Sequence, residues 1–142
     1  IYLGDGIDVV AIDLVTDSQF NAESPNTFSG DTLHSFDFAD DLFDLPFSVD
    51  GELTLIDIAV EFASSLSTAL ASSDALTTAF STDNDGDDID AALVNVQSGS
   101  ASGYYLVVQN TARAAAFDPT TDLVVQMATV ASIDVASLQL FV

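Results

Sequence analysis

In the first third of the chain, apolar and polar positions follow a pattern that predicts short strands and tight turns. Residues 1–16 join a turn rich in glycine and aspartate to a run of branched apolar residues, which is typical of a strand. Residues 17–31 are polar and include Pro25 and Gly30, so we expect a loop there. In residues 32–49, apolar residues alternate with aspartates, which again favours short strands joined by turns.

Residues 54–80 have a helical spacing instead. Apolar residues recur there every three or four positions, at Leu55, Ile58, Ala59, Phe62, Leu66, Ala69 and Leu70. Asp57 and Glu61, near the expected start, suit the positive end of the helix dipole. The run Ser72-Ser73-Asp74 either ends this helix or caps a second short helical turn.

The last third predicts a sheet. After an acidic loop at 83–90, three apolar runs read as strands, at 91–97, 104–109 and 122–128, and the first two flank a glycine-rich hairpin turn. The final residues, ASLQLFV, read as one more strand. We therefore expect an α+β fold that is mainly β, with one main helix at about 55–80 and an antiparallel, sandwich-like sheet at about 91–142.

Charge changes this picture of an ordinary small fold. The chain of 142 residues carries 23 acidic residues against a single basic one, giving a net charge of −22, yet 49% of it is hydrophobic. Self-repulsion at this density opposes compaction unless cations neutralise it, and carboxylate oxygens are the ligands that calcium prefers. A salt-adapted acidic surface is the alternative. Nucleic acid and anionic membranes are excluded as partners, because they require basic residues.

Other absences narrow the class of protein further. Cysteine is absent, which excludes disulfides and thiolate metal sites, and no apolar run is long enough for a membrane span. The chain opens on Ile1 without a classical signal peptide, so we expect a fragment or a processed product of a longer protein.

The first motif lies in the N-terminal turn. Residues 3–11, LGDGIDVVA, fit all but the first glycine of the nonapeptide G-G-x-G-x-D-x-U-x, where U is a large apolar residue. Such repeats build a calcium-binding parallel β-roll. The candidate ligands are Gly4, Asp5, Gly6 and Asp8. A single repeat holds at most part of a site, because the adjacent turn supplies the other ligands.

The second motif is DTLHSFDFADDLFDL, at residues 31–45. It resembles the segment that closes the roll in hemolysin-type (RTX) calcium-binding proteins, and the region from Ser102 to Met127 is similar to their C-terminal part. The resemblance implies export by type I secretion, an extracellular location, and calcium ligands at Asp31, Asp37, Asp40, Asp41 and Asp44. Ser35 departs from the family, which commonly has an aspartate there. A solvated acidic face on a buried hairpin is the alternative interpretation.

The third motif is the acidic loop DNDGDDID. Counting from Gly86 places Ser81 and Ala92 at the first and last ligand positions of an EF-hand, so it is not one. A shallower calcium loop would use Asp83, Asp85, Asp87 and Asp90.

Catalysis is not expected. The single histidine, His34, is the one candidate base for a nucleophilic serine, and no G-x-S-x-G motif accompanies it.

We expect a terminal roll turn at 1–16 and a capping domain at 17–142. The function we expect is that of a secreted, calcium-binding structural module that self-associates in a surface layer, adhesin or matrix fibre. The alternatives are a monomeric folding and secretion cap, and a carbohydrate-binding module.

Overall fold

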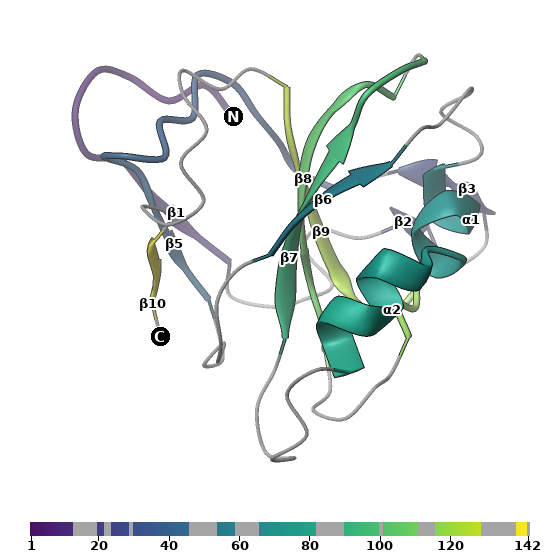
Figure 1. Cartoon of the computed structure of the whole chain (residues 1–142). Helices are drawn as coiled ribbons and strands as arrows, with labels where there is room; N and C mark the ends of the chain where they lie inside the picture. Colours follow the sequence, from purple (N-terminus) through teal and green to yellow (C-terminus); the bar gives the residue numbers. More distant parts are fainter. Residues whose placement is uncertain are drawn as a thin grey trace.

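The chain forms three layers, with a small sheet, a large central sheet and two helices packed in that order (Figure 1). This computed structural model describes residues 1–12, 20–21, 24–28, 30–45, 54–58, 66–81, 90–99, 101–110, 116–128 and 139–141. The fold is therefore α+β and mainly β, as the sequence predicts.

The central sheet has five strands in the order β4-β9-β8-β7-β6. They are β4 (Thr32–Leu33), β6 (Thr54–Ile58), β7 (Ala91–Val96), β8 (Gly103–Val108) and β9 (Leu123–Met127). The three middle strands are antiparallel and confirm the predicted strands and hairpin, whereas β4 and β6 pair in parallel with their neighbours. The sheet is thus mixed, and not the antiparallel sheet expected.

Both faces of the central sheet are buried, because strand residues alternate between two cores. Leu93, Leu106 and Val125 face one core, which also contains Phe36, Phe38 and Phe43. Val94, Val107 and Val124 face the other, which contains the helix residues Leu70, Leu76 and Phe80. This double burial explains why the three middle strands read as nearly continuous apolar runs.

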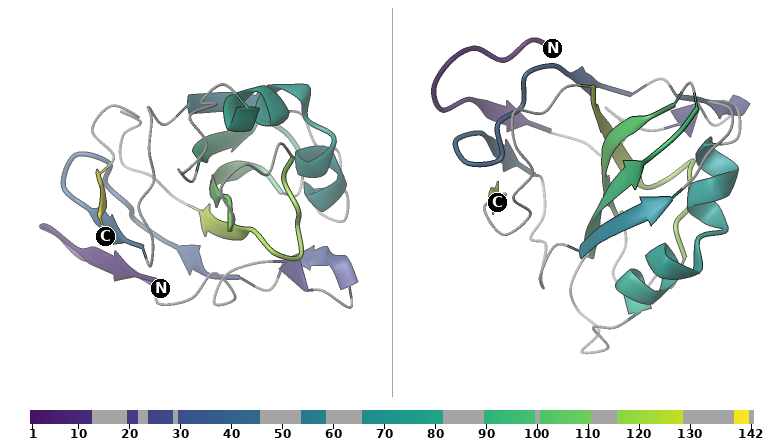
Figure 2. Two further views of the ribbon diagram at one scale, coloured as in Figure 1. Left: turned by 90° about the horizontal axis from the view of Figure 1, so that it is seen from below. Right: turned by 45° about the horizontal axis from the view of Figure 1, so that its top comes forward.

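The small sheet consists of three parallel strands, β1 (Val9–Ala11), β5 (Leu42–Asp44) and β10 (Gln139–Phe141), in the order β1-β5-β10. It lies on the side of the central sheet that faces away from the helices, and both chain ends are on this side (Figures 1 and 2). The predicted strand in the last residues is confirmed.

Two predictions on the secondary structure are wrong in part. Residues 54–58 are a strand, not the first turn of a helix, because β-branched Thr54, Ile56 and Ile58 pair in register along the whole of β7. The helices are α1 (Leu66–Ala71) and α2 (Asp74–Ser81). The polar segment expected to be a loop contains a hairpin of β2 (Phe20–Asn21) and β3 (Ser24–Phe28).

The cap predicted between the helices is confirmed. The backbone N–H of Leu76 donates to the Ser73 hydroxyl at 3.2 Å, so Ser73 satisfies a free donor at the start of α2. Across the described ranges, no helix is long and apolar enough to cross a membrane.

A chain of hydrogen-bonded polar side chains, of which Tyr105 is buried and Thr32 and Gln126 are partly buried, crosses the central sheet. The Thr32 hydroxyl donates to Gln126 Oε1 at 3.1 Å, Gln126 Nε2 donates to the Tyr105 hydroxyl at 3.0 Å, and that hydroxyl donates to the Ala101 carbonyl at 2.8 Å. Burial raises the pKa of Tyr105 to about 12, and the hydrogen bond from Gln126 opposes this shift only partly.

Candidate functional site

The N-terminal segment, residues 1–12, stacks in parallel on residues 31–45, and this stacking is the principal feature of the candidate site. β1 pairs with β5 in register, with Val9 opposite Leu42, and Tyr2 forms a parallel bridge with His34. Backbone hydrogen bonds join the segments along their length: Leu3 N to His34 O (3.1 Å), His34 N to Ile1 O (2.9 Å), Leu42 N to Asp8 O (2.9 Å) and Ile12 N to Asp44 O (2.9 Å). The two segments lie side by side in both views of Figure 2.

A buried aspartate, Asp41, ties the two segments together at the turn before the strands. Its Oδ1 accepts the backbone N–H of Asp8 at 3.0 Å, and its Oδ2 accepts the backbone N–H of Asp37 at 2.8 Å. Asp41 is 1% exposed. A charged acceptor for two backbone donors makes these hydrogen bonds stronger than neutral ones. Asp41 therefore satisfies donors of the local turn and of the neighbouring segment at once.

The same arrangement occurs a second time before β9, around Asp122. Its Oδ1 accepts the backbone N–H of Asn110 at 3.0 Å and its Oδ2 that of Asp118 at 2.8 Å, and Asp122 is 2% exposed. Burial raises the pKa of Asp122 against the opposing effect of these two hydrogen bonds. The Thr120 side chain and backbone both donate to Asp118, and this lowers the pKa of Asp118.

A third, partial copy precedes β1. Oδ2 of Asp8 accepts the backbone N–H of Gly4 at 2.9 Å, so Asp8 bonds the residue four positions before it, as Asp41 and Asp122 do. For Asp41 and Asp122, Oδ1 also accepts an N–H from an adjacent segment. For Asp8, no such donor is present in the part of the chain that the structure describes.

The three aspartate turns share a pattern that sequence reasoning missed. Phe-Asp-x-x-x-Asp-Leu occurs at 36–42 and again at 117–123, and Leu-Gly-x-x-x-Asp-Val occurs at 3–9. Asp118 and Asp122 were therefore not among the predicted site residues. The repeat itself was a detectable signal, because an apolar residue, a spacing of four and an aspartate before a strand recur three times.

The structure brings several predicted calcium ligands together, but as hydrogen-bond acceptors. Asp8, Asp37 and Asp41 share one group of bonds, and Oδ1 of Asp37 accepts the backbone N–H of Ala39 at 3.0 Å. Among the described ranges, no three acidic or histidine side chains gather into a cluster that could hold a metal ion.

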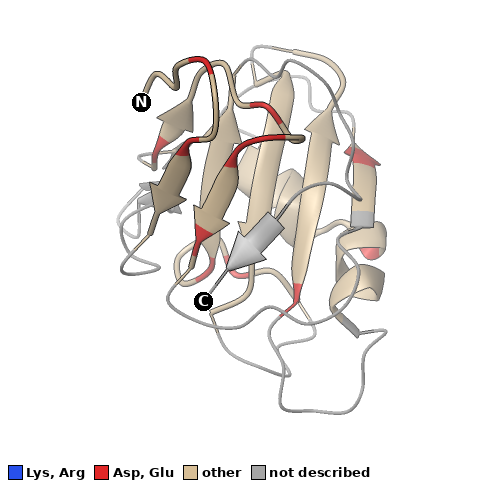
Figure 3. Ribbon diagram, turned by 90° about the vertical axis from the view of Figure 1, so that its left-hand side faces the viewer, with Lys and Arg blue, Asp and Glu red and all other residues tan. Residues whose placement is uncertain are grey.

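The other predicted ligands supply no carboxylate to this group of hydrogen bonds, or lie outside the described residues. Gly4, Asp5, Gly6, Asp40 and Asp44 are exposed, and Gly6 has a φ of 106°, which favours glycine at the turn. Asp31 and Asp90 accept backbone N–H groups through their carbonyls, from Gln126 and Gln109, both at 3.0 Å. Asp83, Asp85 and Asp87 lie outside the described residues. Among the described residues, acidic positions occur mainly in turns and at strand ends (Figure 3).

His34 stacks on Tyr2, with ring centroids 4.4 Å apart and planes 12° apart. Tyr2 is 82% exposed, so the pair lies at the surface of the stacked segments. His34 lies just after β4, outside the named strands, and is held there by its isolated bridge with Tyr2.

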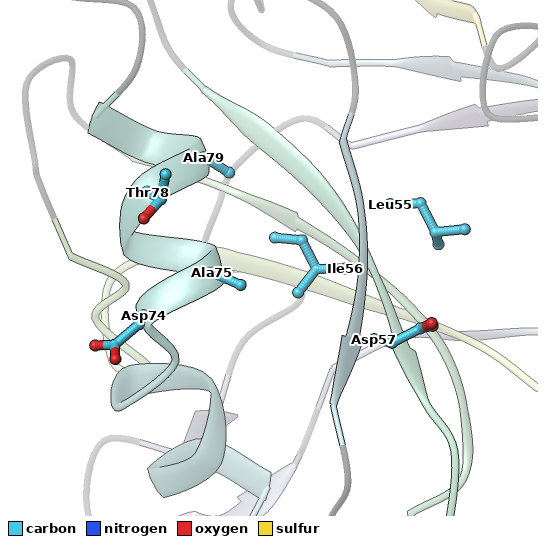
Figure 4. A pocket seen from close by; sticks show the side chains of 7 residues that line it. All are labelled: Leu55, Ile56, Asp57, Asp74, Ala75, Thr78 and Ala79. Atoms are coloured by element: carbon cyan, nitrogen blue, oxygen red, sulfur yellow. The ribbon is translucent and has the colours of Figure 1, made fainter.

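A groove of about 510 Å³ lies between β6 and α2, and two carboxylates are near it. Figure 4 shows Ile56 and Ala75 pointing into the space between strand and helix, whereas Asp57 and Asp74 point away on opposite sides. Asp57 accepts a hydrogen bond from the Asn95 amide at 2.8 Å. The two carboxylates therefore do not face each other across the groove, as a catalytic pair would.

Comparison with known proteins adds no relative. No family model matches the chain, and searches of curated proteins and of solved structures gave no significant match. The resemblance to RTX proteins stays a prediction from residues 3–11, 31–45 and 102–127.

Proposed function

We propose that this chain is a non-catalytic structural module of an exported, RTX-type protein, and that it acts outside the cell by stacking β-strands with neighbouring polypeptide. The observation that carries the proposal is the parallel, in-register stacking of residues 1–12 on 31–45, each segment carrying an aspartate turn. This arrangement is what the end of a parallel roll requires. Among the described strands, β1 of the outermost segment lies at the edge of the small sheet, and strands are commonly added to such an edge.

Calcium has a general role in this proposal, as the cation that neutralises the acidic surface. The net charge of −22 supports it, as does the position of exposed Asp5, Asp40 and Asp44 around the stacked turns. Extracellular calcium, at about millimolar concentration, is high enough to fill weak carboxylate sites that stay empty in the cytosol. The chain would then compact after export, where it meets calcium, and self-association would follow from neutralised edges.

A calcium titration of chelator-treated protein tests this proposal. Far-UV circular dichroism and light scattering should show a cooperative gain of structure, and magnesium at equal ionic strength should be markedly weaker because it dehydrates reluctantly. Two triple variants that each remove three charges locate the effect. D5N/D40N/D44N alters the stacked turns, and D83N/D85N/D87N alters the acidic loop. If calcium and magnesium give equal responses, or if neither gives a response, the acidic residues are solvated surface charges that bind no calcium specifically.

A further inference from the structure

The large apolar side chains that are exposed at the protein surface are concentrated on one segment. Within the described ranges they are Ile1 (57%), Tyr2 (82%), Ile7 (72%) and Val9 (59%), and Leu55 (43%) on β6. The first four belong to the outermost stacked segment. Exposed apolar residues gathered on an edge strand are a mark of an interaction surface.

Within the part of the chain that the structure describes, the backbone of this segment also has hydrogen-bonding groups without a partner on its outer side. Leu42 N donates to Asp8 O and Ile12 N donates to Asp44 O, so the even-numbered residues of β1 face β5. Because alternate residues of a strand direct their backbone groups to opposite sides, Val9 and Ala11 direct theirs outward. We call this outer side of residues 1–11 the open edge.

Asp8 favours one direction, parallel, for a strand that is added to the open edge. Oδ1 of Asp41 accepts the backbone N–H of Asp8, which is the residue just before the parallel strand β1. Oδ2 of Asp41 accepts the backbone N–H of Asp37, which lies four residues before Asp41 itself. Asp8 already makes the second bond, to Gly4 N at 2.9 Å. Its Oδ1 is therefore placed to receive the N–H that precedes one more parallel strand.

We propose that the open edge binds an extended polypeptide segment in parallel, and that Asp8 Oδ1 accepts the backbone N–H just before the bound strand. The occupant has the chemistry of residues 1–12, which occupy the same position on Asp41: an apolar residue, a flexible turn and a strand with an apolar inner face. The inference rests on the proposed role in strand stacking and names its partner, but it does not depend on calcium.

The probe is a labelled peptide with the sequence of residues 1–12, IYLGDGIDVVAI, titrated into the full chain and followed by fluorescence anisotropy. We use EDTA and about 0.5 M sodium chloride, which removes calcium and shortens the range of repulsion between two acidic partners. Saturable binding is expected. A peptide with Val10→Pro should not bind, because it lacks a donor on the side that faces the protein.

Matched variants of the protein test the role of Asp8. Asp8→Asn keeps one oxygen for Gly4 but places an NH2 donor opposite the incoming N–H, so peptide affinity should fall about tenfold or more. Asp5→Asn removes the same charge from the same turn and should change the affinity less than about twofold. Val9→Lys, at an exposed position of the open edge, should also weaken binding.

Three results would overturn the inference. They are a peptide that does not bind, equal losses in Asp8→Asn and Asp5→Asn, and a chain that dimerises through this edge and excludes the peptide. The last would make a second copy the occupant. The peptide assay contains EDTA, so its outcome does not depend on calcium. Failure of peptide binding would therefore overturn this inference alone, and failure of the calcium titration would overturn the proposed role of calcium alone.

Discussion

At the scale of single residues, the clearest device is an aspartate that bonds its own turn and a neighbouring segment. Asp41 and Asp122 do this with both carboxylate oxygens while almost fully buried. Burial of a charge is costly unless hydrogen bonds compensate it, so these aspartates hold the turns in place only as long as all four donors stay aligned.

Asp41→Ala should lower the free energy of unfolding by about 3 kcal/mol, because two backbone donors lose a charged acceptor. Asp40, the neighbouring residue, is exposed. Asp40→Ala removes the same charge and should change the free energy of unfolding by less than about 0.5 kcal/mol. Urea denaturation at neutral pH measures both. Equal losses would mean that net charge, and not the hydrogen bonds, determines the effect.

At the scale of elements, the sequence predicted strands best where burial on both faces leaves long apolar runs, as in β7 to β9. It failed at β6, because the spacing of Leu55 and Ile58 also fits a helix and the pairing with β7 that decides the matter is distant in sequence. The turns at 3–9 and 36–42 were recognised as acidic motifs, but the turn at 117–123 was not, and the backbone hydrogen bonds of all three turns were not predicted. Whether a carboxylate accepts backbone N–H groups or binds an ion depends on three-dimensional neighbours that spacing does not reveal.

The polar chain across β4, β9 and β8 predicts a loss of stability at alkaline pH. The pKa of Tyr105 is raised from 10.0 to about 12 in the folded chain. The stability that the protonated Tyr105 hydroxyl adds is therefore fully present below pH 10 and is lost as the pH rises to about 12. The loss should be on the order of 2 kcal/mol. Lysine is absent, so tyrosines dominate titration in this range.

Urea denaturation at pH 9 and pH 11.5 measures this loss. Tyr105→Phe should be less stable at pH 9, because Ala101 O and Gln126 lose a partner, but should lose much less stability between the two pH values. Tyr104→Phe, its neighbour on β8, is the control and should keep the full pH dependence. A pH dependence that is unchanged in Tyr105→Phe would assign it to another group.

At the scale of the whole molecule, net charge opposes the packing of the three layers. Most of the acidic residues that the structure describes lie in turns and at strand ends (Figure 3), and the exposed ones repel one another through water. Such repulsion is strongly screened by salt. Stability of the whole molecule should therefore depend on ionic strength far more than that of a neutral protein with the same cores.

Raising sodium chloride from about 0.05 to 1 M should stabilise the chain by about 2 kcal/mol, or ~6 °C in Tm. Differential scanning calorimetry in EDTA measures it without any contribution from calcium. Sucrose, which strengthens packing without screening charge, is the control and should shift Tm without reducing the effect of added salt. A Tm that is insensitive to salt in EDTA would show that the carboxylates are too far apart to repel one another.

The order β1-β5-β10 also has a consequence for the timing of folding. Each strand of the small sheet must meet a partner distant in the chain, since Val9 pairs with Leu42 and Leu42 with Gln139. Closing such loops precedes any gain from pairing, which makes parallel sheets slow to form. While the chain is being synthesised, β5 lacks its last neighbour until residues 139–141 emerge. The small sheet is therefore completed only after translation has passed these residues. The core between the central sheet and the helices, whose buried residues lie between Ile56 and Val124, can form first.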